Sequence, residues 1–312
     1  DSYWGNVSLK VNVKLNGRNA TLHADSTNPC YKVFRQFVGC DNSTLVMGGD
    51  VTYFGNKRIS PSLACLVGSL DDNCNHYDAF CNPQPPKQEI ILEFDGAIKQ
   101  FLNSRKKLGI QKPPNRVIYL RDGVSESQMT AIVTEEVPYL RAALAKHCKT
   151  RLPKLLVILV VKREGKRFFA KDVDASPPAG FCVLKDLQDP GPFKNFFLQP
   201  HSGRIGCLIA PRYFVLVDEI GISTLEAALL MNAFCFLWSR ATGAISIPAP
   251  VKCADQFASR MRGTLKEAIL HEKKVDLDAA EKESSDDLVP SLLETARRCV
   301  ASWRVLPPMF YM

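Results

Sequence analysis

The stretch VIYLRDGVSESQ (residues 117–128) decides how this sequence is interpreted. Its apolar run, residues 117–120, has the length and composition of a buried strand, and Gly123 supplies the turn that ends it. Arg121 and Asp122 are therefore expected at the tip of a central strand. A charged pair in that position either caps the sheet in solvent or belongs to a functional site.

Strands and helices are expected on both sides of this stretch. Apolar runs predict strands at 45–54, 62–70, 77–82, 117–120, 155–161 and 213–219. Apolar periodicity predicts helices at 87–109, about 125–148, 223–241 with Ser223 as N-cap, and 251–271. Residues 172–211 form a looser stretch rich in Pro and Gly. Hairpin strands followed by strands that alternate with helices indicate a mixed α/β layer fold.

Composition limits the class of protein. The chain has 312 residues, 46% of them hydrophobic, enough for one large core or two ordinary domains. No apolar stretch reaches the roughly 20 residues that cross a bilayer, and the opening DSYWGNVSLK does not resemble a signal peptide. It is equally consistent with an internal cut from a longer protein. The 11 cysteines form no C-x-x-C pair, and several lie within apolar runs, which favours a reducing compartment such as the cytoplasm.

The positive charge is unevenly distributed. Nine Lys or Arg residues lie between positions 146 and 171 against one acid, Glu164, while the net charge of the whole chain is +8. A basic segment around an apolar strand suggests an anionic partner, with nucleic acid first among the candidates. A solvated face explains the same charge equally well. Neither a G-x-G-x-x-G nor a P-loop motif is present, so a nucleotide cofactor has little support.

Four acids lie where a sheet of this kind would bring side chains together. Asp50 lies inside the first strand, Asp122 ends a strand, Glu89 starts the helix 87–109, and Asp255 is in the first turn of the last helix. Converging carboxylates repel one another unless a cation neutralises them, and oxygen ligands suit Mg²⁺ or Mn²⁺. Two such ions roughly 3.5–4 Å apart would clamp a phosphoryl transfer.

Each acid also has an ordinary explanation. Glu89 and Asp255 are suited to helix N-termini, where the dipole favours acids, and Asp122 is suited to a turn. Asp50 is the hardest to explain in this way, because Asp fits a strand poorly and is costly to bury unpaired.

Several blocks of the sequence, in this order, resemble the PIWI domain of eukaryotic Argonaute proteins. The blocks are GGDVTYFG, PSLACLVGSLD, QEII, YLRDGVSESQ, LVVKREGKRFF, PPAG, VLVDE and SIPAPVKCAD. The resemblance covers nearly the whole chain, from about Val7 to the C-terminal MFYM. It implies a ribonuclease-H-like mixed sheet flanked by helices. It also implies that residues 1–25 are the end of the MID domain and its connection to PIWI, and that residues 26–312 are the PIWI domain.

The resemblance implies a guide-directed endoribonuclease that cuts target RNA by two-metal hydrolysis, leaving a 3′-hydroxyl and a 5′-phosphate. Block by block, the catalytic tetrad of the family falls on Asp50, Glu89, Asp122 and Asp255. Two Mg²⁺ or Mn²⁺ ions would be held by Asp50, Asp122 and Asp255, with Glu89 closing in from its helix end. The implied partners are a small guide RNA, a complementary target RNA, and the MID, PAZ and N-terminal domains of the same protein. Silencing partner proteins are also possible partners, and a membrane is not.

The resemblance further implies two sets of guide contacts. Lys10, Lys14 and Arg260 match positions that hold the guide 5′-phosphate, and three cations around a dianion is sound chemistry. The positions that match contacts to the guide backbone are Lys162, Arg163, Arg167 and His201. The ordinary alternative for both sets is surface cations and a structural histidine.

The chain departs from the family pattern at three places. Glu164-Gly165 replaces a histidine pair, and residues 208–210 lack an expected Arg, for which Arg204 or Arg212 could substitute. Lys252 replaces an aromatic residue. Two rivals to the nuclease remain open. One is a guide-binding silencing platform that never cuts and recruits partner proteins. The other is a ribonuclease-H-like nuclease that uses no guide, against which Lys10, Lys14 and Arg260 count.

Overall fold

The computed structural model describes residues 2–39, 41–55, 58–124, 126–162, 165–170, 176–185, 187, 191–203, 207–273, 285–303 and 309. Within these residues the strands are β1 (Thr44–Tyr53), β2 (Ser62–Ser69), β3 (Tyr77–Gln84), β4 (Arg116–Asp122), β5 (Lys154–Val161), β6 (Phe181–Val183), β7 (Lys194–Gln199) and β8 (Arg212–Asp218). They form one sheet in the order β3-β2-β1-β4-β5-β8-β7-β6. The six predicted strands are confirmed, whereas β6 and β7 lie in the stretch expected to be loose.

The sheet is mixed, with a parallel centre. Strands β1, β4 and β5 run parallel to one another, and β2 and β3 add antiparallel hairpins on the β1 side. On the other side β8, β7 and β6 continue the sheet antiparallel. Because β1, β4 and β5 run the same way, their carboxyl ends meet at one edge of the sheet.

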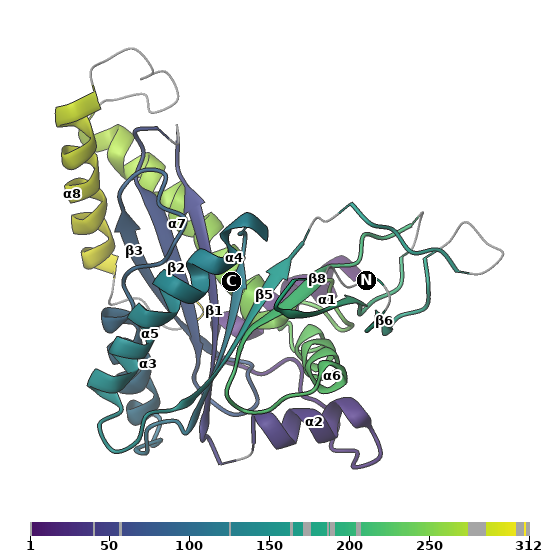
Figure 1. The fold of residues 1–312 in the computed structure, drawn as a ribbon. Helices are drawn as coiled ribbons and strands as arrows, with labels where there is room; N and C mark the ends of the chain where they lie inside the picture. The colour runs from purple at the N-terminus through teal and green to yellow at the C-terminus, as the bar shows by residue number, and fades with distance from the viewer. Residues whose placement is uncertain are drawn as a thin grey trace.

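Helices cover both faces of the sheet (Figure 1). The helical segments are α1 (Ser2–Lys14), α2 (Pro29–Phe37), α3 (Asp95–Lys107), a 3₁₀ turn (Glu126–Gln128), α4 (Met129–Ala131), a π-helical turn (Ile132–Glu136), α5 (Val137–His147), α6 (Thr224–Cys235), α7 (Ala249–Lys273) and α8 (Ser285–Trp303). Helices α3 and α5 lie on one face, and α7 crosses the other (Figure 1).

Alternation along β4 decides which side chains face which helices. Val117 and Tyr119 belong to the hydrophobic cluster of α3 and α5, while Ile118 and Leu120 belong to the cluster of α6 and α7. Successive strand residues point to opposite faces. Arg121 therefore lies on the α3 and α5 face, and Asp122 lies on the α7 face.

The helix predicted at 87–109 begins only at Asp95, so the prediction is wrong for residues 87–94. Glu89 lies in the loop between β3 and α3, not at a helix start. Side chains replace the helical hydrogen bonds here: Gln84 Nε2 donates to the Ile90 carbonyl (3.1 Å), and Gln84 Oε1 accepts from the Leu92 amide (3.0 Å). The apolar spacing that suggested a helix arises because this loop buries Ile90, Ile91 and Phe94.

Other boundaries differ less. Ser223 is the N-cap of α6 as predicted, in a capping box with Glu226, but α6 ends at Cys235 and not near residue 241. Helix α7 begins at Ala249, which places Asp255 in its second turn and corrects the predicted first turn. The predicted helix 125–148 is divided by the π-helical turn, and α1, α2 and α8 were not predicted. In the part of the chain described, no helix has the length and apolar character needed to cross a membrane.

Candidate active site

Three of the four predicted acids converge at the carboxyl edge of the parallel strands. Asp50, Asp122 and Asp255 each offer a carboxylate oxygen, and these atoms lie within 4.8 Å of one another. Gly49 of β1 is paired with Arg121 of β4 in the parallel register. The residues that follow them, Asp50 on β1 and Asp122 on β4, are therefore neighbours on one face of the sheet. Helix α7 supplies Asp255 from above that face.

A glycine allows α7 to come close enough. A Cβ atom on Gly48 would stand 2.1 Å from the Pro250 carbonyl oxygen, so any side chain here would push the start of α7 away from β1. Asp50 follows Gly48 by two residues on β1, and Asp255 follows Pro250 by five residues on α7. Gly48 is therefore the residue that lets α7 bring Asp255 to the strand acids.

Burial leaves the strand carboxylates poorly solvated. Burial, and next the negative charge of Asp122, raise the pKa of Asp50 to about 7. Burial also raises the pKa of Asp122, against the opposing effect of Lys162. Burial would raise the pKa of Asp255 too, but a hydrogen bond from Lys252 and the charges of Lys162 and Lys252 lower it overall. Repulsion between buried carboxylates favours a protonated acid or an added cation.

Two lysines already supply part of the positive charge. Lys162 Nζ forms an ion pair with Asp122 Oδ2 and lies 3.4 Å from Asp255 Oδ1. Lys252 Nζ lies 2.6 Å from Asp255 Oδ2. In the part of the chain that the structure describes, Asp50 has no ion pair. Three carboxylates with two ammonium groups still favour one more positive charge.

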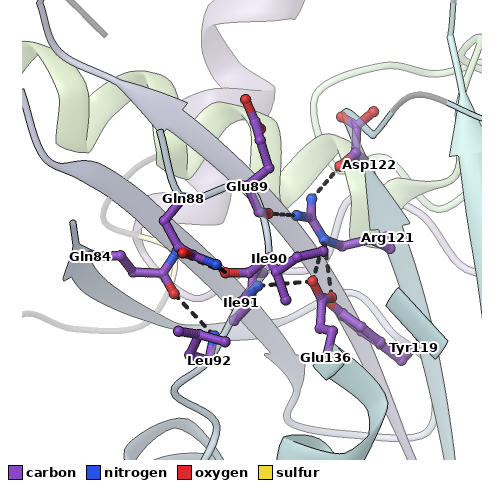
Figure 2. A network of polar contacts seen from close by, with 10 residues as sticks. All are labelled: Gln84, Gln88, Glu89, Ile90, Ile91, Leu92, Tyr119, Arg121, Asp122 and Glu136. Atoms are coloured by element: carbon purple, nitrogen blue, oxygen red, sulfur yellow. Dashed lines mark hydrogen bonds and ion pairs between the residues drawn. The ribbon is translucent and has the colours of Figure 1, made fainter. Parts of the chain in front are cut away.

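Glu89 is not part of this group of acids. Its carboxylate accepts a hydrogen bond from Tyr53 Oη (2.8 Å), and its backbone carbonyl accepts one from Arg121 Nη2 (2.6 Å). Figure 2 shows the Glu89 and Asp122 carboxylates pointing toward the same end of the sheet, from the loop and from β4. The predicted role of Glu89 as the fourth acid stays a prediction.

The residues matched to guide-backbone contacts have different surroundings. Lys162 lies on the acids, Arg167 is exposed, and His201 is partly buried, which lowers the pKa of its imidazole. Arg163 lies outside the described residues. Arg212, considered as a substitute for the missing Arg, is fully buried and donates to Asn195 Oδ1 (2.8 Å), so it is not available at the surface. Arg204, the other substitute, lies outside the described residues.

Of the residues matched to 5′-phosphate binding, Lys14 is affected by the charge of Arg260. Burial, and then the charges of Arg260 and Arg240, lower the pKa of Lys14. Arg240, which the sequence did not single out, also donates to Gln256 Oε1 (3.0 Å). Lys10 is exposed one helical turn before Lys14 in α1. Cations gathered closely enough to lower the pKa of Lys14 are an arrangement that an anion would stabilise.

Sequence reasoning also missed Glu136, a buried acid that forms an ion pair with Arg121 on the opposite face of the sheet. No periodicity distinguishes such a residue from a surface acid on a helix. The signal that could have predicted it is Arg121, which lies on the same buried face of its strand as Tyr119, two residues earlier, and there requires an acidic partner.

A sequence model of the Piwi domain matches residues 1–266 of this chain. Protein argonaute of Schizosaccharomyces pombe is 32% identical over 265 residues, covering 83% of this chain and 30% of that protein. Protein argonaute 4 of Arabidopsis thaliana is 31% identical over 276 residues, covering 85% of this chain and 29% of that protein. The chain thus spans less than a third of the length of these relatives.

Solved structures give the same picture. The C-terminal lobe of a budding yeast Argonaute matches with a TM-score of 0.77 at 27% identity, covering 92% of this chain and 58% of that one. The Argonaute of Kluyveromyces polysporus, crystallised with a guide RNA, also matches with a TM-score of 0.77, at 25% identity, covering 92% of this chain and 35% of that one. These likenesses confirm the predicted ribonuclease-H-like mixed sheet flanked by helices.

Proposed function

Since this chain belongs to the Piwi domain family, we propose that it is the RNA-cutting lobe of an Argonaute protein in RNA silencing. The observation that carries this proposal is the convergence of Asp50, Asp122 and Asp255 within 4.8 Å at the carboxyl edge of the sheet. The reaction is hydrolysis of a target RNA strand paired with a guide, which leaves a 3′-hydroxyl and a 5′-phosphate.

The residues present fit a divalent metal. The donor set is all carboxylate oxygen, which hard ions such as Mg²⁺ or Mn²⁺ prefer. Two lysines face three carboxylates, so one negative charge remains without a positive partner, and burial raises the pKa of Asp50 and so opposes its ionisation. We assign Asp50, Asp122 and Asp255 as the residues that hold two ions. When bound, such ions neutralise charge at the scissile phosphate and lower the pKa of an attacking water.

The chain's own residues have separate roles in this proposal. Asp50 and Asp122 present their carboxylates from neighbouring strands, and Asp255 completes the set from α7. Glu89 is the fourth acid, held in its loop and oriented through Tyr53. Lys162 occupies the cluster in this structure and must give up Asp122 when ions bind.

We assign the guide to the basic residues around the site. Lys10, Lys14 and Arg260 bind its 5′-phosphate, and Arg240 joins them because its charge already acts on Lys14. The residues that contact its backbone are Lys162, Arg163, Arg167 and His201, while base pairing supplies sequence specificity. The other partners are the target RNA and the MID, PAZ and N-terminal domains. We place the protein in the cytoplasm, and we keep residues 1–25 as the end of MID and 26–312 as PIWI.

One observation favours a second candidate, a silencing platform that binds guide and recruits partners without cutting. Lys162 and Lys252 partly neutralise the acids, and Glu89 lies outside the group of three aspartates. In this candidate, the three aspartates stabilise the fold through their ion pairs with the lysines and take no part in catalysis.

Guide-directed cleavage separates the two candidates. The protein in its natural length is loaded with a 5′-phosphorylated guide and given a matched labelled RNA, with Mg²⁺ or with EDTA. If the protein is a nuclease, it is expected to give one product, cut at a fixed distance from the guide 5′ end. That product is expected to be absent with EDTA and with a non-complementary RNA. Tight guide binding with no product in Mg²⁺ would contradict the nuclease and favour the platform.

A further inference from the structure

Two cysteines, Cys65 and Cys81, face one another across strands β2 and β3. They are directly opposite in the antiparallel register, and their sulfur atoms lie 3.7 Å apart. Both residues are buried, at 0% and 4% exposed, and both thiols are free. Because opposite residues of neighbouring strands project from the same face of a sheet, the two thiols share one environment.

The row of side chains that holds these thiols continues to the acid cluster. Asp50 of β1 is paired with Cys65 of β2, and Cys65 is paired with Cys81 of β3. The three side chains therefore project from one face, in a line across the sheet. Burial raises the pKa of Cys65 most, followed by its hydrogen bond with Cys81 and then by charge, including that of Asp50. A chemical change at these sulfurs is thus a change beside the aspartates.

The backbone geometry at this pair suits a disulfide. Opposite residues of antiparallel strands have Cα atoms roughly 4.5 or 5.5 Å apart, and disulfides join Cα atoms roughly 4.4–6.8 Å apart. The sulfurs, now 3.7 Å apart, must approach to about 2.05 Å. Since the strands already stand at a suitable spacing, we expect rotation of the two side chains to close the bond.

Burial determines which oxidant reaches the pair and how fast. Cys81 retains slight exposure, whereas Cys65 has none. A small oxidant such as hydrogen peroxide is therefore favoured over a bulky disulfide, and it meets Cys81 first. The thiolate is the reactive form of cysteine, so the raised pKa of Cys65 makes its reaction slow.

We propose that Cys65 and Cys81 are a peroxide-responsive pair, in which Cys65 converts oxidised Cys81 to a disulfide before it becomes an irreversible acid. The Cys81 sulfur attacks one peroxide oxygen, becomes a sulfenic acid and releases one water. The Cys65 sulfur then attacks the Cys81 sulfur, forms the S–S bond and releases the second water. The two thiols lose two electrons and two protons, and one hydrogen peroxide becomes two waters.

The disulfide keeps a further negative charge away from the aspartates. A sulfenic acid without a neighbouring thiol proceeds to sulfinic and sulfonic acids, which thiols do not reduce. Such an acid in the row of Asp50 would add negative charge to a face that already carries three converging carboxylates. The disulfide is neutral, and thiols reverse it.

Peptide mapping of the protein in its natural length tests the pair directly. The protein is treated with hydrogen peroxide for several hours, denatured and alkylated, and then cleaved before aspartates. This cleavage places Cys65, Cys74 and Cys81 in separate peptides, because aspartates lie between them. Mass spectrometry is expected to find the Cys65 and Cys81 peptides joined in at least half of the chains, with Cys74 alkylated. Dithiothreitol is expected to separate them. Alkylated Cys65 and Cys81 without joined peptides, or equal joining of Cys74, would overturn the proposal.

Two variants test the role of Cys65. In Cys65→Ala, Cys81 is expected to accumulate as a sulfinic acid that dithiothreitol does not restore. Cys74→Ala, which removes the buried thiol between the two strands and keeps the pair, is the control and is expected to behave like wild type. Full recovery of the Cys81 thiol in peroxide-treated Cys65→Ala would reject the role of Cys65.

This inference does not rest on the proposed function, and its test needs neither cleavage nor metal. If wild type does not cut RNA, the proposed function fails while peptide mapping still decides the fate of the two thiols. If Cys65→Ala does not fold, the joined peptides are still measured in the unaltered chain, and their absence would reject the proposal.

Discussion

At the residue scale, Lys162 and Lys252 give the acid cluster its charge balance. Both ammonium groups contact Asp255, and Lys162 also contacts Asp122. Lys252 stands three residues before Asp255 on the same helix face, at one of the three places where the sequence departs from the family pattern. An ion that binds the aspartates competes with these lysines, so the lysines set how tightly it binds.

Lys252→Met is expected to tighten binding of Mg²⁺ or Mn²⁺. Removing a half-buried ion pair worth about 1 kcal/mol should lower the dissociation constant of the metal about fivefold. Calorimetric titration of the RNA-free protein measures this change. Lys99→Met, at an exposed position of α3, is the control and should bind metal like wild type. Equal or weaker metal binding by Lys252→Met would contradict the competition.

Gly48→Ala is expected to destabilise the protein by roughly 2–4 kcal/mol, because its Cβ would stand 2.1 Å from the Pro250 carbonyl oxygen. The control is Gly263→Ala in α7, where a Cβ meets nothing within 4 Å. Alanine is favoured over glycine inside a helix, so the control should gain about 0.5–1 kcal/mol. Urea unfolding of both variants measures the free energies, and equal stability of the two would refute the close approach.

At the element scale, the sequence predicted the strands better than the loop that carries Glu89. The apolar run 155–161 matches β5 closely, because a strand buried on both faces reads as a continuous apolar run. The segment 87–94 has the apolar spacing of a helix, yet side chains of Gln84 and Glu136 bind its backbone. Such tertiary bonds leave no periodic trace in a sequence.

The capping box of α6 is a local feature that was predictable from one residue, Ser223. Its side chain accepts from the Glu226 amide (3.2 Å), and the Glu226 carboxylate accepts from the Ser223 amide (2.9 Å). Ser223→Ala is expected to lower the free energy of unfolding by about 1 kcal/mol. Thermal unfolding at fixed pH measures it, with Ser202→Ala outside any helix as the control. No loss relative to that control would show that the cap does not stabilise the fold.

At the scale of the whole molecule, the parallel strands explain why acids far apart in sequence meet. The ends of β1 and β4 were predictable, so the meeting of Asp50 and Asp122 was too. The approach of Asp255 depends on Gly48 and on the path of α7; the sequence placed Asp255 at a helix N-terminus that could face the strand ends, and the family resemblance assigned it to the same site. The sequence contained no local indication that Lys162 contacts Asp122 and Asp255 or that the charge of Arg240 acts on Lys14, because both interactions depend on long-range packing.

The basic residues at the start of the chain and in α7 predict a preference for a 5′-phosphorylated guide. Arg240→Ala is expected to weaken binding of a 5′-phosphorylated guide about tenfold, because a charge-assisted hydrogen bond contributes about 1.5–3 kcal/mol. Binding of a 5′-hydroxyl guide, which lacks the phosphate, is expected to weaken by less than about threefold. Fluorescence anisotropy at constant salt measures both affinities. Equal losses for the two guides would place Arg240 on the backbone or outside the site.

The most direct test of the account is single-turnover cleavage by four variants with equal guide loading. The variants are Asp50→Ala, Glu89→Ala, Asp122→Ala and Asp255→Ala, and Glu135→Gln serves as the solvent-facing control. Each of the four alanine variants is expected to lose at least about a thousandfold in rate, because Asp50, Asp122 and Asp255 hold the proposed ions and Glu89 is the proposed fourth acid. Glu135→Gln is expected to cut like wild type. Wild-type cutting by Asp50→Ala, Asp122→Ala or Asp255→Ala would contradict the assignment of the converged aspartates as the active site.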